Sequence, residues 1–393
     1  MVGTFPGRSQ ALGLITTQLQ AHFRLSDVAY ANINFWATLL GASACIGFGR
    51  LVDRFGVRWV TTALAVGLGL VAWQTTLVST VMGLAIVLTL SRALGQSALS
   101  VASISITPQW FGRRLPLAMS IYSVVLSIGF AIAFLVAGQV VETQDWRVLW
   151  RTVGGILVLG LAPMTALLLR RGPEEMGWVR ESSACDPRKN APVASLTFQQ
   201  ALRSSMFWAF AIGAALYALI ASGAGLFNEA IFVERHFTSA DFHTVLGITA
   251  LSSLTGNFLA GWLTNRIRLS WLMAGTMVVL AASLVAFLFV ENRPQLWIQS
   301  AAMGISGGFV MVLFFSIWGR AFGPGHLGLI QGAAQVMTVL ASAVGPLIFA
   351  EVKEWTHSYR PLFWGLASTV AVVGLWCSLV RLPHQPGREA EAR

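Results

Sequence analysis

The chain has 393 residues, of which 55% are hydrophobic and 11% are charged, and its mean hydropathy is +0.69. Soluble domains carry about 25% charged residues, so this composition argues against a soluble enzyme, a disulfide scaffold, a disordered chain and a nucleic-acid-binding domain. The 26 basic and 16 acidic residues leave a net charge of +10. In a membrane protein such an excess is typical of cytoplasmic loops, where arginine and lysine accumulate.

Cysteine and histidine show no metal-site or redox spacing. The three cysteines, Cys45, Cys185 and Cys377, form no C-x-x-C pair, and the six histidines form no H-E-x-x-H motif. The sequence also has no P-loop, which disfavours ATP-driven pumping. We therefore expect no metal, no cofactor and no enzyme activity, and we disfavour an integral-membrane enzyme.

Eleven stretches are apolar over the roughly 20 residues that a membrane-spanning helix needs. In chain order we expect spans at 28–49, 59–78, 81–107, 115–141, 148–170, 206–233, 241–264, 270–290, 294–320, 327–352 and 361–382. A polar, proline-containing stretch separates the fifth span from the sixth, and a polar segment follows the last span. We therefore expect four parts: an N-terminal bundle at 1–170, a linker at 171–204, a C-terminal bundle at 205–382 and a disordered tail at 383–393.

The two halves repeat one another at an offset of 212 to 214 residues. His22-Phe23 before one span corresponds to His236-Phe237, and Gly13-Leu14 corresponds to Gly225-Leu226. The offset places a twelfth helix within residues 1–20, shortened at its N-terminus. We expect either a start codon upstream of Met1 or an unusually short first helix. A repeat of this size is typical of secondary transporters, whose binding site lies near the bilayer midplane at the repeat interface.

Basic residues are concentrated in the loops on one side of the expected membrane. That side includes the linker at 171–204 and the C-terminal tail. The positive-inside rule therefore places the linker and C-terminus in the cytoplasm, and we expect a multi-pass protein of a bacterial-type inner or plasma membrane.

The segment GRLVDRFGVR, Gly49 to Arg58, lies between the second and third expected helices. It resembles the loop signature of the major facilitator superfamily, and a weaker copy runs from Gly261 to Arg268 with Asn265 in place of the acid. Glycine permits close helix approach, and an acid among arginines can form a charge cluster that holds one conformation. The alternative is a positive-inside anchor without a switching role. The predicted gating residues are Gly49, Asp53, Arg54, Gly56, Arg58, Gly261, Asn265 and Arg266.

Four further segments resemble one branch of this superfamily, and a fifth resembles a motif of the superfamily as a whole. Arg92-Ala-Leu-Gly95-Gln96 is similar to a second superfamily motif. The others resemble the monocarboxylate-transporter and oxalate–formate-exchanger branch: FPGRS at 5–9, WFGRR at 110–114, DWR at 145–147 and RGPEEMG at 171–177. The resemblance implies an all-α integral membrane protein with two six-helix bundles related by a pseudo-two-fold repeat, the major facilitator fold. It also implies a monomeric secondary active transporter that works by alternating access.

One pair of positions departs from that branch. Its proton-coupled members place an acid and an arginine one turn apart in the eighth helix, and the corresponding positions here are Asn257 and Ser253. This departure argues against proton symport of the lactate type and leaves a proton, a sodium ion or a counter-substrate open as the coupling species.

Two arginines, Arg8 and Arg92, fall inside expected spans. A basic residue at mid-membrane costs about 2.5–3.5 kcal/mol on insertion scales, so each should face a cavity or a partner. Only one acid, Glu229, lies well inside a span. An anionic substrate could supply the missing charge through bidentate bonds, and the alternative is that the arginines hold the bundle together. The predicted substrate-binding residues are Arg8, Arg92, Tyr122, Tyr217, Asn257, Gln331 and Gln335.

The sequence therefore predicts a transporter of a small organic anion, a monocarboxylate or dicarboxylate. Its expected partners are that solute and the lipid bilayer, and we expect no nucleic-acid partner. Two alternatives stay open. A multidrug or hydrophobic-solute exporter would use Glu229 to attract cations. A transporter-like sensor would bind solute without moving it.

Overall fold

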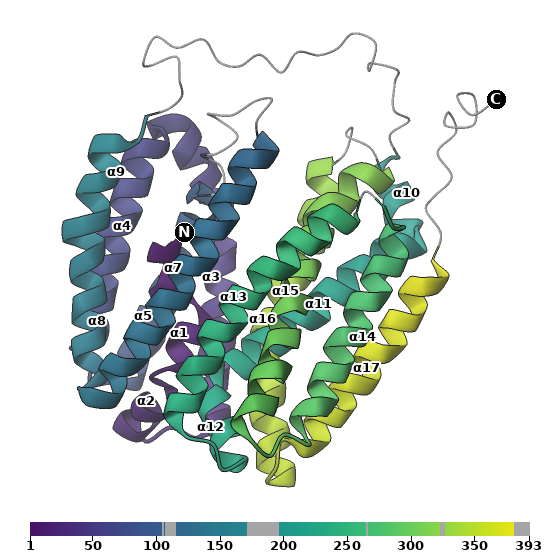
Figure 1. The fold of residues 1–393 in the computed structure, drawn as a ribbon. Helices are drawn as coiled ribbons and strands as arrows, with labels where there is room; N and C mark the ends of the chain where they lie inside the picture. The colour runs from purple at the N-terminus through teal and green to yellow at the C-terminus, as the bar shows by residue number, and fades with distance from the viewer. Residues whose placement is uncertain (104–105, 107–114, 171–195, 265, 323–326, 381–393) are drawn as a thin grey trace. The chain divides into compact units, whose positions relative to one another are not determined.

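The structure is a computed structural model that describes residues 1–103, 106, 115–170, 196–264, 266–322 and 327–380, with the backbone alone at 44–54, 115–120, 239 and 327–328. Every regular element in these ranges is a helix (Figure 1). Ten helices in the described part of the chain are long and apolar enough to cross a membrane. The helix at Asp27–Phe55 has 29 residues, which is also sufficient for a crossing.

Each of the eleven expected spans is mainly helical over the residues that the structure describes. The first-half helices are α3 (Asp27–Phe55), α4 (Val57–Thr75), α5 (Val81–Ser91) with η2 (Arg92–Leu99), α7 (Leu115–Thr143), and α8 (Trp146–Gly155) with η3 (Ile156–Leu161) and α9 (Ala162–Leu168). The second-half helices are α11 (Ser205–Leu226) with α12 (Asn228–Glu234), α13 (Ser239–Leu263), α14 (Leu269–Phe287), α15 (Arg293–Phe322), α16 (Leu327–Thr356) and α17 (Arg360–Leu379).

The expected first helix is present but discontinuous. It consists of η1 (Val2–Gly7), α1 (Ser9–Gly13) and α2 (Thr16–Phe23). Arg8, between η1 and α1, is extended, with φ −88° and ψ 141°. Pro6 has no backbone N–H and Gly7 has weak helix propensity, which explains a break at this position. Non-helical backbone at membrane depth is tolerated where it is buried in protein or lines a cavity.

The chain divides into two compact units. Unit 1 contains residues 1–183, 221–247 and 343–358, and unit 2 contains residues 184–220, 248–342 and 359–393. The predicted bundle boundaries therefore stay a prediction. The predicted linker lies largely outside the described residues. Its described end includes α10 (Phe198–Arg203), which Thr197 and Gln200 cap reciprocally. The predicted tail also lies outside the described residues.

Residues that correspond in the repeat contact one another inside unit 1. The Ser9 and Ser222 hydroxyls are 3.1 Å apart, and Thr17 donates to Glu229 at 2.5 Å, at sequence separations of 213 and 212 residues. Gly13 packs against the carbonyl of Gly225, so a side chain there would clash with main chain. Positions related by a two-fold rotation can touch only near its axis, so these contacts agree with the offset found in the sequence.

Glycines allow α13 and α15 to pack closely in unit 2. Gly256 faces the main chain of Ile305, and Gly304 and Gly308 face the main chain of Thr249 and Ser253. Small residues at these positions let two helix backbones approach each other. The Gly304-x-x-x-Gly308 sequence is therefore a helix-packing motif.

Candidate functional site

Arg92 is one of the largest fully buried side chains, at 2% exposure. Its Nη1 donates to the carbonyl oxygen of Gly7 at 3.1 Å, to Ser9 Oγ at 3.0 Å and to Gln96 Oε1 at 2.6 Å, and Nη2 donates to Asn34 Oδ1 at 3.1 Å. All four acceptors are neutral. This guanidinium therefore joins the first span, α3 and η2, as the bundle-holding alternative requires.

Close main-chain approach brings Arg92 to the first span. Gly7 lies against the main chain of Ser91, Gly95 and Gln96, with no room for a side chain. Gly41 of α3 lies equally close to Arg92 itself. The segment Arg92–Leu99 is a π-helix, a wider turn that is frequent at functional sites. The glycines and the π-turn together place the guanidinium among its acceptors.

Arg8 is only half-buried and has fewer partners. Its Nε donates to Thr4 Oγ1 at 3.1 Å, and its Nη2 donates to Ser100 Oγ at 3.3 Å and lies 3.7 Å from Met1 Sδ. The guanidinium carbon lies 5.6 Å from the centre of the Phe130 ring, in a cation–π arrangement. Nη1 makes no hydrogen bond to any residue that the structure describes.

Tyr122 lies within electrostatic range of Arg8, without a hydrogen bond to it in the described structure. Its hydroxyl is 3.1 Å from Ser103 Oγ. Residues Arg8, Ser100, Ser103, Tyr122 and Phe130 all belong to unit 1, and we call them the Arg8 cluster. The structure thus brings together two of the predicted binding residues, Arg8 and Tyr122, and adds a hydroxyl and an aromatic ring to them.

Neither membrane arginine pairs with an acid among the described residues. Acids of the described residues pair with other groups: Asp145 forms an ion pair with Arg147 at 3.3 Å and Glu234 with Lys353 at 2.5 Å, and Glu142 lies within hydrogen-bond distance of His243 at 2.9 Å. Glu229 accepts from Thr17. The Arg8 cluster therefore combines a positive charge with neutral neighbours.

The other predicted binding residues belong to unit 2. The Tyr217 hydroxyl lies against Gly307, and the side-chain oxygen of Asn257 is buried without a hydrogen-bond partner in the described structure. Gln331 is half-buried, whereas Gln335 is exposed and donates to Thr338 Oγ1 at 3.1 Å. Tyr217 and Asn257 both contact the glycine-rich face of α15, so they share one polar region within unit 2.

The predicted gating residues are described only in part. The side chains of Gly49, Asp53 and Arg54 and the whole of Asn265 lie outside the described structure, so their role stays a prediction. Gly56 has φ 82°, a conformation that favours glycine, at the junction of α3 and α4.

Two arginines of these loops contact nearby groups. Arg58 donates from Nε to the carbonyl of Ala166 at 2.5 Å. The Arg266 guanidinium lies 4.2 Å from the centre of the Trp262 ring. Gly261 has open space where a side chain would project. These contacts anchor the loop ends and leave the switching role untested.

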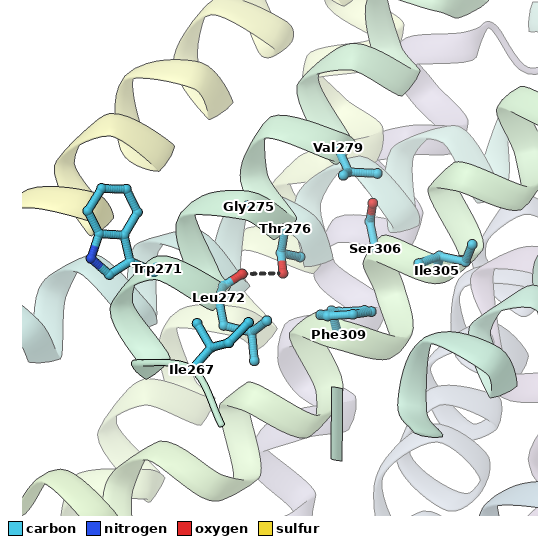
Figure 2. A pocket seen from close by; sticks show the side chains of 9 residues that line it. All are labelled: Ile267, Trp271, Leu272, Gly275, Thr276, Val279, Ile305, Ser306 and Phe309. Atoms are coloured by element: carbon cyan, nitrogen blue, oxygen red, sulfur yellow. Dashed lines mark hydrogen bonds between the residues drawn. The ribbon is translucent and has the colours of Figure 1, made fainter. Parts of the chain in front are cut away.

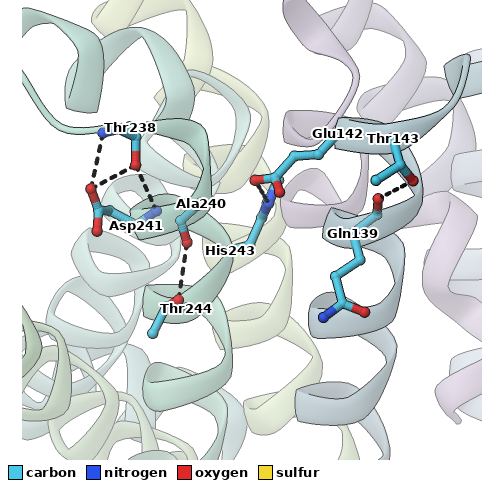
Figure 3. A network of polar contacts seen from close by, with 8 residues as sticks. All are labelled: Gln139, Glu142, Thr143, Thr238, Ala240, Asp241, His243 and Thr244. Carbon is cyan, nitrogen blue, oxygen red and sulfur yellow. Dashed lines mark hydrogen bonds and ion pairs between the residues drawn. The ribbon is translucent and has the colours of Figure 1, made fainter.

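A polar network between α7 and α13 was not expected from the sequence (Figure 3). His243 Nδ1 lies 2.9 Å from Glu142 Oε1, and the imidazole packs on Gly138. Two residues earlier on α13, Asp241 accepts from the backbone N–H and hydroxyl of Thr238, whose Oγ1 accepts from the Asp241 N–H, so the two residues cap the helix reciprocally. Glu142 falls one residue beyond the expected span 115–141. Hydropathy alone therefore assigns Glu142 to a loop, and the contact with His243 could not be predicted.

A second group joins α12 to the end of α16. Glu234 accepts from Lys353 Nζ and, at 2.7 Å, from Ser358 Oγ. These residues also belong to unit 1. This pairing could not be predicted from the sequence, because 119 residues separate the two charges.

The family is shown by comparison with known proteins. The model of the Major Facilitator Superfamily matches residues 5–232 and 210–393, so the chain belongs to this superfamily of membrane transporters. It is an integral, multi-pass membrane protein of a family of carriers. The predicted all-α major facilitator fold is confirmed.

A relative supports the resemblance to the monocarboxylate-transporter branch. Monocarboxylate transporter 6 of Mus musculus is 32% identical over 159 residues, which cover 39% of this chain and 32% of the mouse protein. The matched segment thus spans about a third of that relative's length.

Solved structures show the same fold. A D-xylose–proton symporter superposes with a TM-score of 0.73 at 13% identity, covering 98% of this chain and 97% of the symporter. A bacterial homologue of the human lysosomal transporter Spinster gives a TM-score of 0.67 at 16% identity, covering 96% of this chain and 92% of that protein. At these identities the likeness concerns the fold alone.

Proposed function

We propose that this transporter moves a small organic anion, a monocarboxylate or dicarboxylate, by alternating access, and that Arg8 binds the anionic group. The observation that carries the proposal is the state of Arg8. It is a half-buried guanidinium at a break in the first span, with neutral neighbours and an Nη1 that donates to no described residue.

Chemistry favours a carboxylate at this position. A guanidinium binds a carboxylate through two parallel N–H···O bonds, and Tyr122 and Ser100 offer hydroxyls beside it. Discontinuous helices are common at the binding sites of secondary transporters. The name of the mouse relative, a monocarboxylate transporter, agrees with this substrate class. Arg92, in contrast, bonds to the protein through both Nη groups, with only its Nε left without a partner in the described structure, and we propose that it positions the first span and does not bind substrate.

Uptake by the purified full chain in proteoliposomes tests the proposal. We expect Arg8→Gln to weaken the apparent affinity for a transported carboxylate at least tenfold, since a hydrogen bond to a charged group contributes about 1.5–3 kcal/mol. Arg8→Lys should be intermediate, because it keeps the charge and loses the planar pair of donors.

Arg24→Gln is the matched control. It removes the same charge from the exposed end of the same broken span and should leave uptake unchanged. Equal affinity in the wild type and Arg8→Gln for every carboxylate tested would overturn the role of Arg8.

The same vesicles distinguish the alternatives. Counterflow of a labelled carboxylate supports a carrier, whereas binding without flux would identify a sensor. Uptake of hydrophobic cations that depends on Glu229 would identify a multidrug exporter. An imposed proton or sodium gradient, or a preloaded counter-substrate, then identifies the coupling species.

We further propose a bacterial-type inner membrane with the linker and C-terminus in the cytoplasm, and a monomeric carrier. Most basic residues outside the spans lie on the linker side. Alkaline phosphatase fused after residue 393 should be inactive if the C-terminus is cytoplasmic. Activity would reverse the orientation. The mass of the purified detergent complex, corrected for detergent, measures the oligomeric state.

A further inference from the structure

A groove separates α14 from α15 in unit 2 (Figure 2). Its volume is about 320 Å³, and its walls include Ile267, Trp271, Gly275 and Val279 on one side and Ile305 and Phe309 on the other. Trp271 and Val279 are themselves 57% and 41% exposed, so the groove opens on the surface of the unit. In a membrane carrier, the outer surface of membrane-spanning helices such as α14 and α15 faces lipid.

The walls of the groove provide few hydrogen-bonding groups. Besides the indole N–H of Trp271, the lining side chains carry two hydroxyls, and both are used within their own helices. Thr276 donates to the carbonyl of Leu272 at 2.8 Å, and Ser306 donates to that of Ala302 at 2.9 Å. The part of a ligand that occupies this space must therefore be hydrocarbon.

The depth of the groove follows from a missing side chain. Gly275 lies one turn above Trp271 and one turn below Val279 on the same face of α14, and a Cβ at Gly275 would meet nothing within 4 Å. At 1.5 Å per residue, Trp271 and Val279 are about 12 Å apart along the helix. The groove thus runs along the membrane normal, the direction of a lipid acyl chain.

Positive charge lies at the end of the groove where α14 begins. Arg266 and Arg268 flank Ile267, and all three are exposed. The Arg268 side chain makes no hydrogen bond or ion pair within the described structure, and the Arg266 guanidinium lies against the face of the Trp262 ring. Trp262 and Trp271 are both more than half exposed, as is usual for indoles at the membrane interface. The two arginines therefore lie at the level of lipid headgroups.

We propose that this groove binds an anionic phospholipid, with one acyl chain along Gly275 and the phosphate at Arg266 and Arg268. The apolar wall selects the chain, and the two guanidiniums select net negative charge. Each basic residue near an anionic membrane surface strengthens binding severalfold. The proposal is independent of the transported solute.

Native mass spectrometry of the purified, delipidated full chain tests this site. Dioleoyl phosphatidylglycerol and dioleoyl phosphatidylcholine have the same chains and differ in net charge. We expect the wild type to bind one phosphatidylglycerol at least tenfold more tightly than phosphatidylcholine. Arg268→Gln should reduce this preference severalfold, and Gly275→Leu, which fills the groove, should abolish the tight binding.

Gly365→Leu provides a matched control. Gly365 of α17 is also exposed, with nothing within 4 Å of an added Cβ, and its substitution should leave phosphatidylglycerol binding intact. Undiminished binding to Gly275→Leu, or equal affinity for the two lipids, would overturn the proposal. If Gly275→Leu fails to fold, unchanged lipid preference in Arg268→Gln is sufficient to refute it.

Discussion

Arg8 and Arg92 carry the same charge in neighbouring helices, but their surroundings give them different roles. Arg92 is 2% exposed and donates to four neutral acceptors on three segments. Arg8 is half-buried and donates to Thr4 and Ser100, with Nη1 left over. A guanidinium whose two Nη groups both bond to the protein, as in Arg92, stabilises the protein, whereas one with an unused Nη group, as in Arg8, can bind a ligand. Burial and partners, not charge alone, distinguish the two.

We therefore predict that Arg92→Ala destabilises the protein while Arg8→Gln does not. Removing the Arg92 guanidinium leaves the carbonyl of Gly7 and the amide of Asn34 buried without their donor, at about 1–3 kcal/mol for each unsatisfied group. The midpoint of thermal unfolding in detergent should fall by at least about 3 °C for Arg92→Ala. Arg8→Gln and the control Arg24→Gln should remain close to the wild type. An equal fall in Arg92→Ala and Arg24→Gln would contradict the structural role of Arg92.

At the level of helices, the sequence predicted the membrane spans, whose length the bilayer sets, but not the irregular turns within them. The spans follow from hydropathy because membrane thickness fixes their length. The break at Arg8 was not predicted, although Pro6 and Gly7 favour it, and the π-turn from Arg92 leaves no signal in hydropathy. Helix rotation could not be predicted from one sequence either. Ser100, which contacts Arg8, therefore went unnoticed, and the site role of Gln335 stays a prediction.

Close packing of α13 on α15 gives a prediction at this scale. A side chain at Gly308 would collide with the main chain of Ser253, which cannot move without displacing α13. Gly308→Val should therefore destabilise the protein by about 3 kcal/mol, visible as a lower unfolding midpoint and a lower yield of monodisperse protein. Gly332→Val of α16, where an added Cβ meets nothing within 4 Å, is the control. Similar midpoints for the two variants would show that α13 and α15 are not in close contact.

At the scale of the whole molecule, unit 1 combines the first half with segments 221–247 and 343–358 of the second half. The contacts inside it include Glu142 with His243, Thr17 with Glu229, and Ser9 with Ser222. Each joins a first-half helix to a second-half helix. If the protein works by alternating access, contacts of this kind must break during the cycle, so their strength sets the population of the state seen here.

The pair Glu142–His243 provides the test, with Ser222 as the reporter. Ser222 is 5% exposed, so a cysteine at this position, in a chain whose native cysteines have been replaced, should react slowly with a membrane-impermeant maleimide. Glu142→Gln removes the charge that pairs with His243, and a loss of about 1.4 kcal/mol corresponds to a tenfold change in population. We expect the labelling rate at position 222 to rise by up to that factor. Glu291→Gln, at an exposed acid in unit 2, should leave the rate unchanged. If the Glu142→Gln rate equals that of Glu291→Gln, the pair does not hold this state closed, and the unit 1 contacts are static packing.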